Sequence, residues 1–72
     1  MATDICISLG QRIRRLRKER GWRQIDLAAH SGINAVHISY LERGSKEVCL
    51  RSLQVIANTF EMTVRELLKG VE

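Results

Sequence analysis

Residues 24–44 read QIDLAAHSGINAVHISYLERG, and the fold can be worked out from these 21 residues outward. Its apolar residues recur at helical spacing on both sides of Gly32, which suits the left-handed backbone of a sharp turn. Asn34 follows as a good N-cap residue. The stretch therefore predicts a helix over about 24–31, a turn at Gly32, and a second helix that begins after Asn34 and ends near Gly44.

The chain before this stretch predicts another helix. Leu9, Ile13 and Leu16 form the apolar stripe of an amphipathic helix over about 6–20, which Gly21 ends. Arg17 falls beside that stripe, so we expect its side chain to be partly buried. In the same way, Glu42 falls beside the inward face of the helix that ends near Gly44.

The chain after this stretch also reads as helical. A loop over 43–49 precedes an apolar stripe formed by Leu50, Leu53, Ile56, Ala57 and Phe60. The run from Thr63 to Glu66 has the capping-box pattern that starts a helix. No segment alternates in the manner of a surface strand. The sequence therefore predicts an all-α fold of five short helices.

Length and charge narrow the class of protein. With 72 residues the chain holds one domain, which we take as residues 1–72. Twelve basic residues oppose eight acidic ones, and residues 1–24 alone hold seven basic and two acidic residues. A basic cluster on a small domain favours a polyanion or an anionic membrane surface as partner, although a merely solvated basic helix stays an open alternative.

Several other classes of function are not supported. Cys6 and Cys49 follow no secretory signal, so we expect two buried, reduced thiols in an intracellular protein. The cysteines and histidines lack zinc-site spacing, and we expect no metal and no cofactor. No apolar run is long enough to span a membrane. His37 and Ser39 point in different directions on one helix, so we expect no enzymatic activity.

One motif connects these elements to a known family. The pattern Gln24-x-x-Leu27-Ala28-x-x-x-Gly32-x-x-x-x-x-Ile38-Ser39-x-x-Glu42-Arg43-Gly44 resembles the lambda-repressor-like (XRE) helix-turn-helix family. The resemblance runs from about residue 9 to 68 and implies a helix-turn-helix over about 24–43. It also implies an ion pair between an arginine late in the first helix and a glutamate near the end of the third. Those residues are Arg17 and Glu42, and the alternative is two unrelated solvated charges.

The resemblance implies that double-stranded DNA is the partner. The helix after Asn34 would enter the major groove, and the helix from Gln24 would lie across the backbone. The positions that would touch DNA are Gln24, Asn34, Ala35, Val36, His37, Ser39, Tyr40, Arg43 and Lys46. Phosphates would also be neutralised by Arg12, Arg15 or Arg23. Ala35 and Val36 lack bidentate hydrogen-bonding groups, so readout there would be contact with thymine methyl groups.

Members of this family usually bind DNA as twofold dimers. The candidate interface is the apolar C-terminal region, with Phe60, Met62, Val64, Leu67 and Leu68. A homodimer would place its recognition helices about 34 Å apart on a pseudo-palindromic operator.

The subtype and the cellular setting follow from the same resemblance. As a compact member of this kind, the chain resembles the controller proteins of restriction-modification systems. Such controllers can also contact RNA polymerase. Small phage, plasmid or antitoxin-type repressors are the alternative, and a protein-interaction module on the same fold is the alternative from another class. The expected location is the cytoplasm of a bacterium.

Overall fold

The computed structural model describes residues 4–71, and within them the chain forms five α-helices and no strand. The helices are α1 (Ile5–Glu19), α2 (Gln24–Ser31), α3 (Ala35–Arg43), α4 (Leu50–Thr59) and α5 (Val64–Leu67). The all-α architecture predicted from apolar spacing is confirmed. In this range no helix is long and apolar enough to cross a membrane.

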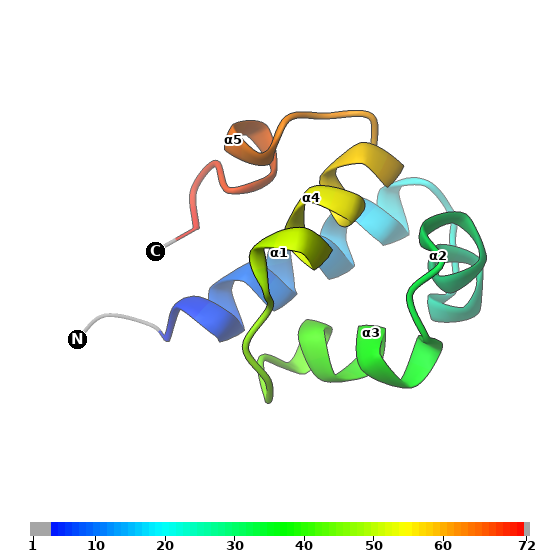
Figure 1. Cartoon of the computed structure of the whole chain (residues 1–72), viewed down its shortest axis with the longest axis horizontal. Helices are drawn as coiled ribbons and strands as arrows, with labels where there is room; N and C mark the ends of the chain where they lie inside the picture. Colours follow the sequence, from blue (N-terminus) through cyan, green and yellow to red (C-terminus); the bar gives the residue numbers. More distant parts are fainter. Residues whose placement is uncertain (1–3, 72) are drawn as a thin grey trace.

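The helices surround α1, which crosses the middle of the molecule (Figure 1). In this view α3 lies at the bottom and α5 at the top, while α2 lies at the right-hand end. Helix α3 packs mainly on α1 and α2, and α4 packs on α2 and α5. Among residues 4–71, no element covers the lower side of α3 in this view.

Side-chain caps start three of the five helices. Asp4 accepts a hydrogen bond from the Cys6 backbone N–H at 2.8 Å. At α5 the predicted capping box is present, since Glu66 N–H donates to Thr63 Oγ1 at 3.0 Å and Thr63 N–H donates to Glu66 Oε1 at 2.9 Å. These hydrogen bonds lower the pKa of Glu66, because they favour its charged form. They also satisfy N–H groups that the helix itself leaves unpaired.

The hydrophobic core draws on every helix. Its buried members are Leu9, Ile13, Leu16, Leu27, Ile38, Leu41, Leu53, Ile56, Ala57, Phe60 and Leu67. Apart from Leu50, the apolar stripes read from the sequence supply these residues. Leu50, predicted in the stripe of α4, is 77% exposed at the first residue of that helix, so helical periodicity assigned its inward position wrongly. Trp22 closes the core at the end of α1, where its ring stacks on His30 with centroids 4.3 Å apart.

Two predictions about apolar and thiol side chains are wrong. Phe60 and Leu67, predicted at a dimer interface, are completely enclosed by the protomer's own core. The stripes on α4 and α5 have only one small core to fill, and these two side chains fill it. Cys6 and Cys49 are free thiols, but Cys6 is only half buried and Cys49 is exposed at the start of α4.

The predicted ion pair lies between α1 and α3. Arg17 Nε donates to Glu42 Oε2 at 2.6 Å, and Arg17 Nη2 donates to Glu42 Oε1 at 3.0 Å. Each residue is only 7% exposed. The remaining guanidinium nitrogen, Nη1, donates to the backbone carbonyl of Trp22 at 2.7 Å. Hydrogen bonding to Glu42 raises the pKa of Arg17, and burial acts in the opposite direction without reversing the shift.

A glycine that the sequence pattern did not single out allows α1 and α3 to meet. Gly10 lies in the middle of α1 and is buried against the last turn of α3. A Cβ atom at this position would overlap the carbonyl oxygen of Leu41 and would lie 2.5 Å from that of Glu42. The two helix backbones therefore touch, and only glycine fits at the crossing.

We expect Gly10→Ala to destabilise the fold although alanine is the better helix former. Alanine gains about 1 kcal/mol of helix propensity. Its methyl group would press on backbone atoms, which cannot turn aside as a side chain can, so we expect a net loss of roughly 2 kcal/mol in the free energy of unfolding.

Urea unfolding followed by circular dichroism measures this change. Gln11→Ala is the matched control, because Gln11 is the next residue of α1 and is exposed. Equal stability of Gly10→Ala and the control would show that the two helices can separate at no cost.

Candidate nucleic-acid interface

The turn between α2 and α3 has the geometry of a helix-turn-helix. Gly32 ends α2 in the left-handed conformation, with a φ of 77°. Asn34 then begins α3, and its Oδ1 accepts a hydrogen bond from the Val36 N–H at 2.8 Å. Ile38 and Leu41 of α3 are buried against the core. Because these residues fix which side of α3 faces inward, they also decide which side faces outward.

The outward side of α3 carries the residues predicted to read DNA. Asn34, Val36 and Arg43 are exposed, and Val36 is 60% exposed, which is unusual for a branched apolar side chain. The partly exposed positions of α3 are Ala35, His37, Ser39 and Tyr40. The face is therefore largely neutral, with apolar groups in its first turn and a cation at its end.

Asn34 has a structural task in addition to its predicted one. Its Oδ1 caps α3, which leaves the side-chain NH₂ group as a donor. A bidentate contact to adenine would use both ends of the amide, so it would compete with the cap.

Gln24 joins the buried ion pair to the start of α2. Its Nε2 donates to Glu42 Oε1 at 3.2 Å, and the side chain is partly buried. Glu42 therefore receives hydrogen bonds from both Arg17 and Gln24. This network ties α1, α2 and α3 together directly behind the outward face. The phosphate contact expected of Gln24 stays a prediction.

Arg12 has a different task from the one predicted. Its Nε donates to the carbonyl of Leu67 at 3.2 Å, and its Nη2 donates to that of Glu66 at 3.0 Å. These contacts hold the C-terminal end of α5, on the side of α1 opposite to α3 (Figure 1). Arg12 thus adds side-chain donors to the last carbonyls of α5, of which that of Glu66 also accepts from the Lys69 N–H. Its guanidinium is therefore engaged at α5 and is not free for a phosphate.

Arg23 is also engaged, although it remains on the surface. Its Nε and Nη2 both lie 3.2 Å from the carboxylate of Asp26, and Asp26 also accepts from the Arg23 backbone N–H at 2.8 Å. Hydrogen bonding to Arg23 lowers the pKa of Asp26, and the same pairing raises the pKa of Arg23. An exposed pair of this kind can exchange its partner for a phosphate at little cost.

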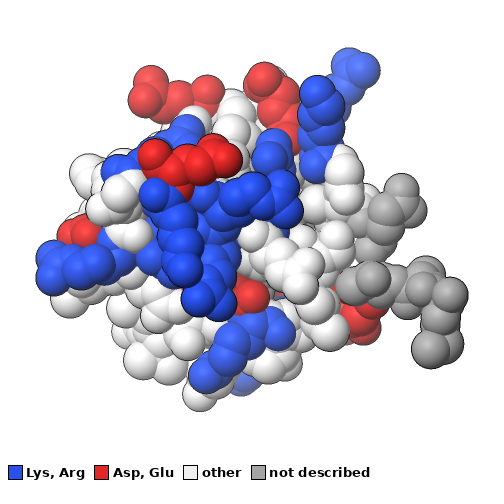
Figure 2. Space-filling model, turned by 180° about the vertical axis from the view of Figure 1, so that it is seen from behind, with Lys and Arg blue, Asp and Glu red and all other residues white. Residues whose placement is uncertain are grey.

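The remaining cations of α1 gather on one exposed surface. Figure 2 shows lysine and arginine side chains massed at the centre of the face seen from behind. Arg15 is exposed, and its predicted phosphate contact stays a prediction. Arg14 and Lys18 are also exposed, and Lys18 follows Arg15 by three residues and Arg14 by four, so the three side chains lie beside one another on the helix. Sequence reasoning had left Arg14 and Lys18 aside. The signal that identifies them is the spacing of exposed residues on the helix.

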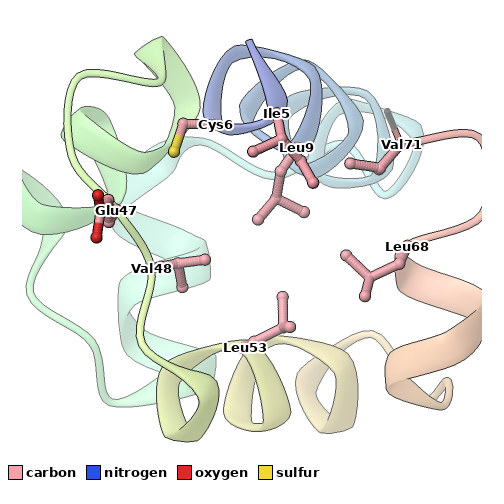
Figure 3. A pocket seen from close by; sticks show the side chains of 8 residues that line it. All are labelled: Ile5, Cys6, Leu9, Glu47, Val48, Leu53, Leu68 and Val71. Atoms are coloured by element: carbon pink, nitrogen blue, oxygen red, sulfur yellow. The ribbon is translucent and has the colours of Figure 1, made fainter.

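A shallow apolar groove lies on another side of the molecule, at the N-terminal end of α1. Its volume is about 350 Å³, and Leu68 and Val71 point into it across from Leu53 (Figure 3). Leu68 is therefore turned toward α1 and α4. Only Met62 and Val64 of the predicted dimer residues lie outside both the buried core and this groove, and both pack partly against the core.

Possible metal ligands do not cluster in the described part of the chain. Between residues 4 and 71, no three histidine, cysteine or acidic side chains are grouped to hold a metal ion. Hydrogen bonding with Ser52 lowers the pKa of the exposed Cys49 thiol, whose sulfur lies 3.2 Å from Ser52 Oγ.

Known proteins share this arrangement. A family model described as helix-turn-helix, HTH_3, matches residues 13–67. The HTH-type transcriptional regulator DdrOP3 of Deinococcus deserti is 44% identical over 66 residues, which are 92% of this chain and 51% of that protein. The chain thus spans about half the length of this curated relative.

Two solved structures superimpose closely on this chain. The restriction-modification controller protein C.AhdI from Aeromonas hydrophila has a TM-score of 0.82 and 34% sequence identity, over 86% of this chain and 94% of that chain. The controller protein C.Esp1396I, solved as a tetramer with its natural 35 base-pair operator, has a TM-score of 0.85 and 26% identity, over 97% of this chain and 92% of that chain.

We expect Glu42→Ala to destabilise the protein strongly, by about 3–5 kcal/mol in the free energy of unfolding, because it leaves the Arg17 charge buried without its partner. The double variant Arg17→Met, Glu42→Leu replaces both charges with apolar groups and recovers most of that loss.

Urea titrations of the three proteins measure these differences. Arg23→Ala is the control, since it breaks an exposed ion pair and is expected to leave the unfolding midpoint near that of the unaltered protein. A Glu42→Ala midpoint equal to that of the control would mean that the buried pair does not hold the helices together.

Proposed function

The chain belongs to the helix-turn-helix (HTH_3) family, and from this membership we propose that it is a sequence-specific DNA-binding transcriptional regulator. The observation that carries the proposal is the uncovered outward face of α3, which is held in place from behind by the buried network of Arg17, Glu42 and Gln24. In this proposal α3 enters the major groove and the N-terminus of α2 faces the phosphate backbone.

The contacts divide into two kinds. Base edges would be read by Asn34, His37 and Ser39, and thymine methyl groups by Ala35 and Val36. Phosphates would be bound by Gln24, Arg43 and Lys46, with Arg15 and Arg23 nearby. Phosphate contacts supply affinity for any duplex, whereas the small, nearly neutral reading face supplies the preference for one sequence.

We propose that the chain is a regulator of the controller type. The support is that it matches 94% of the C.AhdI chain at 34% identity, with a TM-score of 0.82. The second candidate is a small phage, plasmid or antitoxin-type repressor, and the 44% identity to a longer Deinococcus transcriptional regulator supports a regulator outside the controller type. An RNA polymerase contact and a cytoplasmic location belong to the proposal in either case.

Self-association completes the proposed function, because one small domain covers only half of a palindromic site. We relocate the dimer interface to the exposed side of α4 and the start of α5. Leu50 is 77% exposed there, and it lines a shallow surface with Arg51, Gln54 and Val64. Of the five interface residues predicted from the sequence, this interface would include Val64, and Met62 is close to Val64 in the chain.

Selection of duplexes from a random pool, followed by salt titration of the selected sequence, tests DNA binding. The logarithm of the binding constant should fall steeply with the logarithm of the salt concentration, and Arg43→Ala should reduce that slope by about 1. Asn34→Ser should relax the preference at one base position while keeping the cap of α3.

Lys69→Ala is the matched charge control, because Lys69 is exposed beside α5 and far from α3 in the chain. It should leave binding nearly unchanged. Absence of duplex binding by the unaltered protein at about 50 mM salt contradicts the proposed function and leaves the protein-interaction alternative.

We expect Leu50→Glu to keep the chain folded and monomeric, because the side chain is mostly exposed in the protomer and a charge cannot be buried in the seam without a partner. Light scattering at high micromolar concentration measures the mass, and operator affinity should fall roughly tenfold or more as one half-site is lost.

Ile25→Glu is the control for self-association, since Ile25 is an equally apolar exposed residue on α2. It should leave the mass unchanged. A monomer for the unaltered protein at these concentrations would exclude the dimer.

A further inference from the structure

Tyr40 lies beside two exposed cations, Arg43 at the end of α3 and Lys46 in the turn that follows. Its ring is partly buried on α3. The guanidinium carbon of Arg43 lies 5.2 Å from the ring centroid, and Nζ of Lys46 lies 5.0 Å from it. Both distances fall within the range of cation–π attraction.

The backbone brings Lys46 back to this ring. Gly44 ends α3 in the left-handed conformation, with a φ of 69°, and a Cβ atom there would lie 2.5 Å from Ile7 Cα of α1. Ser45 then donates twice to the carbonyl of Tyr40, from its N–H at 3.1 Å and from its hydroxyl at 3.2 Å. The turn is therefore fixed at both of its ends, and it returns the chain over Tyr40.

Neither cation is neutralised by this arrangement. In residues 4–71 the carboxylates that form salt bridges pair with Arg17 and Arg23, and none pairs with Arg43 or Lys46. An uncharged ring thus restrains two positive side chains and leaves their charge available. A carboxylate would restrain them equally well, but it would cancel the charge that a phosphate needs.

We propose that Tyr40 is a positioning residue, which holds Arg43 and Lys46 in place for the phosphates of one DNA strand. The role rests on the proposed function. Long side chains lose conformational freedom when they bind, and this loss weakens affinity. If the ring orders the side chains of Arg43 and Lys46 before DNA binds, this loss of conformational freedom on binding is smaller. The residue thereby acts through its neighbours, whereas the sequence resemblance placed Tyr40 among the residues that read bases.

Two substitutions separate the ring from the hydroxyl group. Tyr40→Phe keeps the ring and should bind duplexes within about twofold of the unaltered protein. Tyr40→Leu removes the ring and should bind about three- to tenfold more weakly, from the ordering of two side chains. The loss should be the same for the selected operator and for an unrelated duplex, because all duplexes share their phosphates.

Salt dependence distinguishes positioning from contact. Tyr40→Leu keeps both cations, so the slope of the binding constant against salt should not change. Arg43→Ala removes one phosphate contact and should lower the slope by about 1. In the background of Arg43→Ala and Lys46→Ala, the further change Tyr40→Leu should have no additional effect, because nothing is left to position.

The outcomes against the proposal are equally specific. A loss confined to the selected operator would assign Tyr40 to base reading. A loss that persists without Arg43 and Lys46, or one that Tyr40→Phe reproduces in full, also overturns the positioning role. Failure of the unaltered protein to bind any duplex overturns the proposed function and this role together.

Folding is monitored separately through Trp22, which stacks on His30 and Phe60 at the far end of α1. Its fluorescence should match in all variants. Should Tyr40→Leu unfold, Tyr40→Met replaces it in the same experiments, as a longer apolar side chain without a ring. If the folded Tyr40→Met protein binds duplexes as tightly as the unaltered protein, the positioning role of Tyr40 is overturned.

Discussion

The guanidinium of Arg17 and the carboxylate of Glu42 meet in the interior, and the position of α3 depends on them. Neither charge can remain buried alone, so α1 and α3 must bring them together. Gln24 adds α2 to the same carboxylate. Three helices are therefore oriented by one group of hydrogen bonds, and the outward face of α3 takes its direction from that group.

The absence of a side chain at Gly10 is the second constraint, and it supports the first. The backbones of α1 and α3 touch at this residue, about two turns before Arg17 in α1. A larger residue would separate the helices by the width of a methyl group and lengthen the short contacts to Glu42. Close approach and charge pairing are thus two conditions on a single helix crossing.

Much of the fold and part of the site could be predicted from the sequence. Apolar spacing and capping residues identified every helix, because both are set by neighbours within one turn. The Arg17–Glu42 pair came from a family resemblance and from two charges beside apolar stripes. The dimer residues were partly misassigned, because a stripe does not say whether Phe60 and Leu67 fill the core or extend beyond it.

Local sequence is enough to define the helices, the turn at Gly32, and the residues on the outward face of α3. These depend on local backbone conformation and helical period. Only the tertiary structure decided which cations are free, since Arg12 and Arg17 bind partners 55 and 25 residues away and Tyr40 gathers Arg43 and Lys46 across a turn. Charge can be counted along a chain, but its availability depends on distances that exist only after folding.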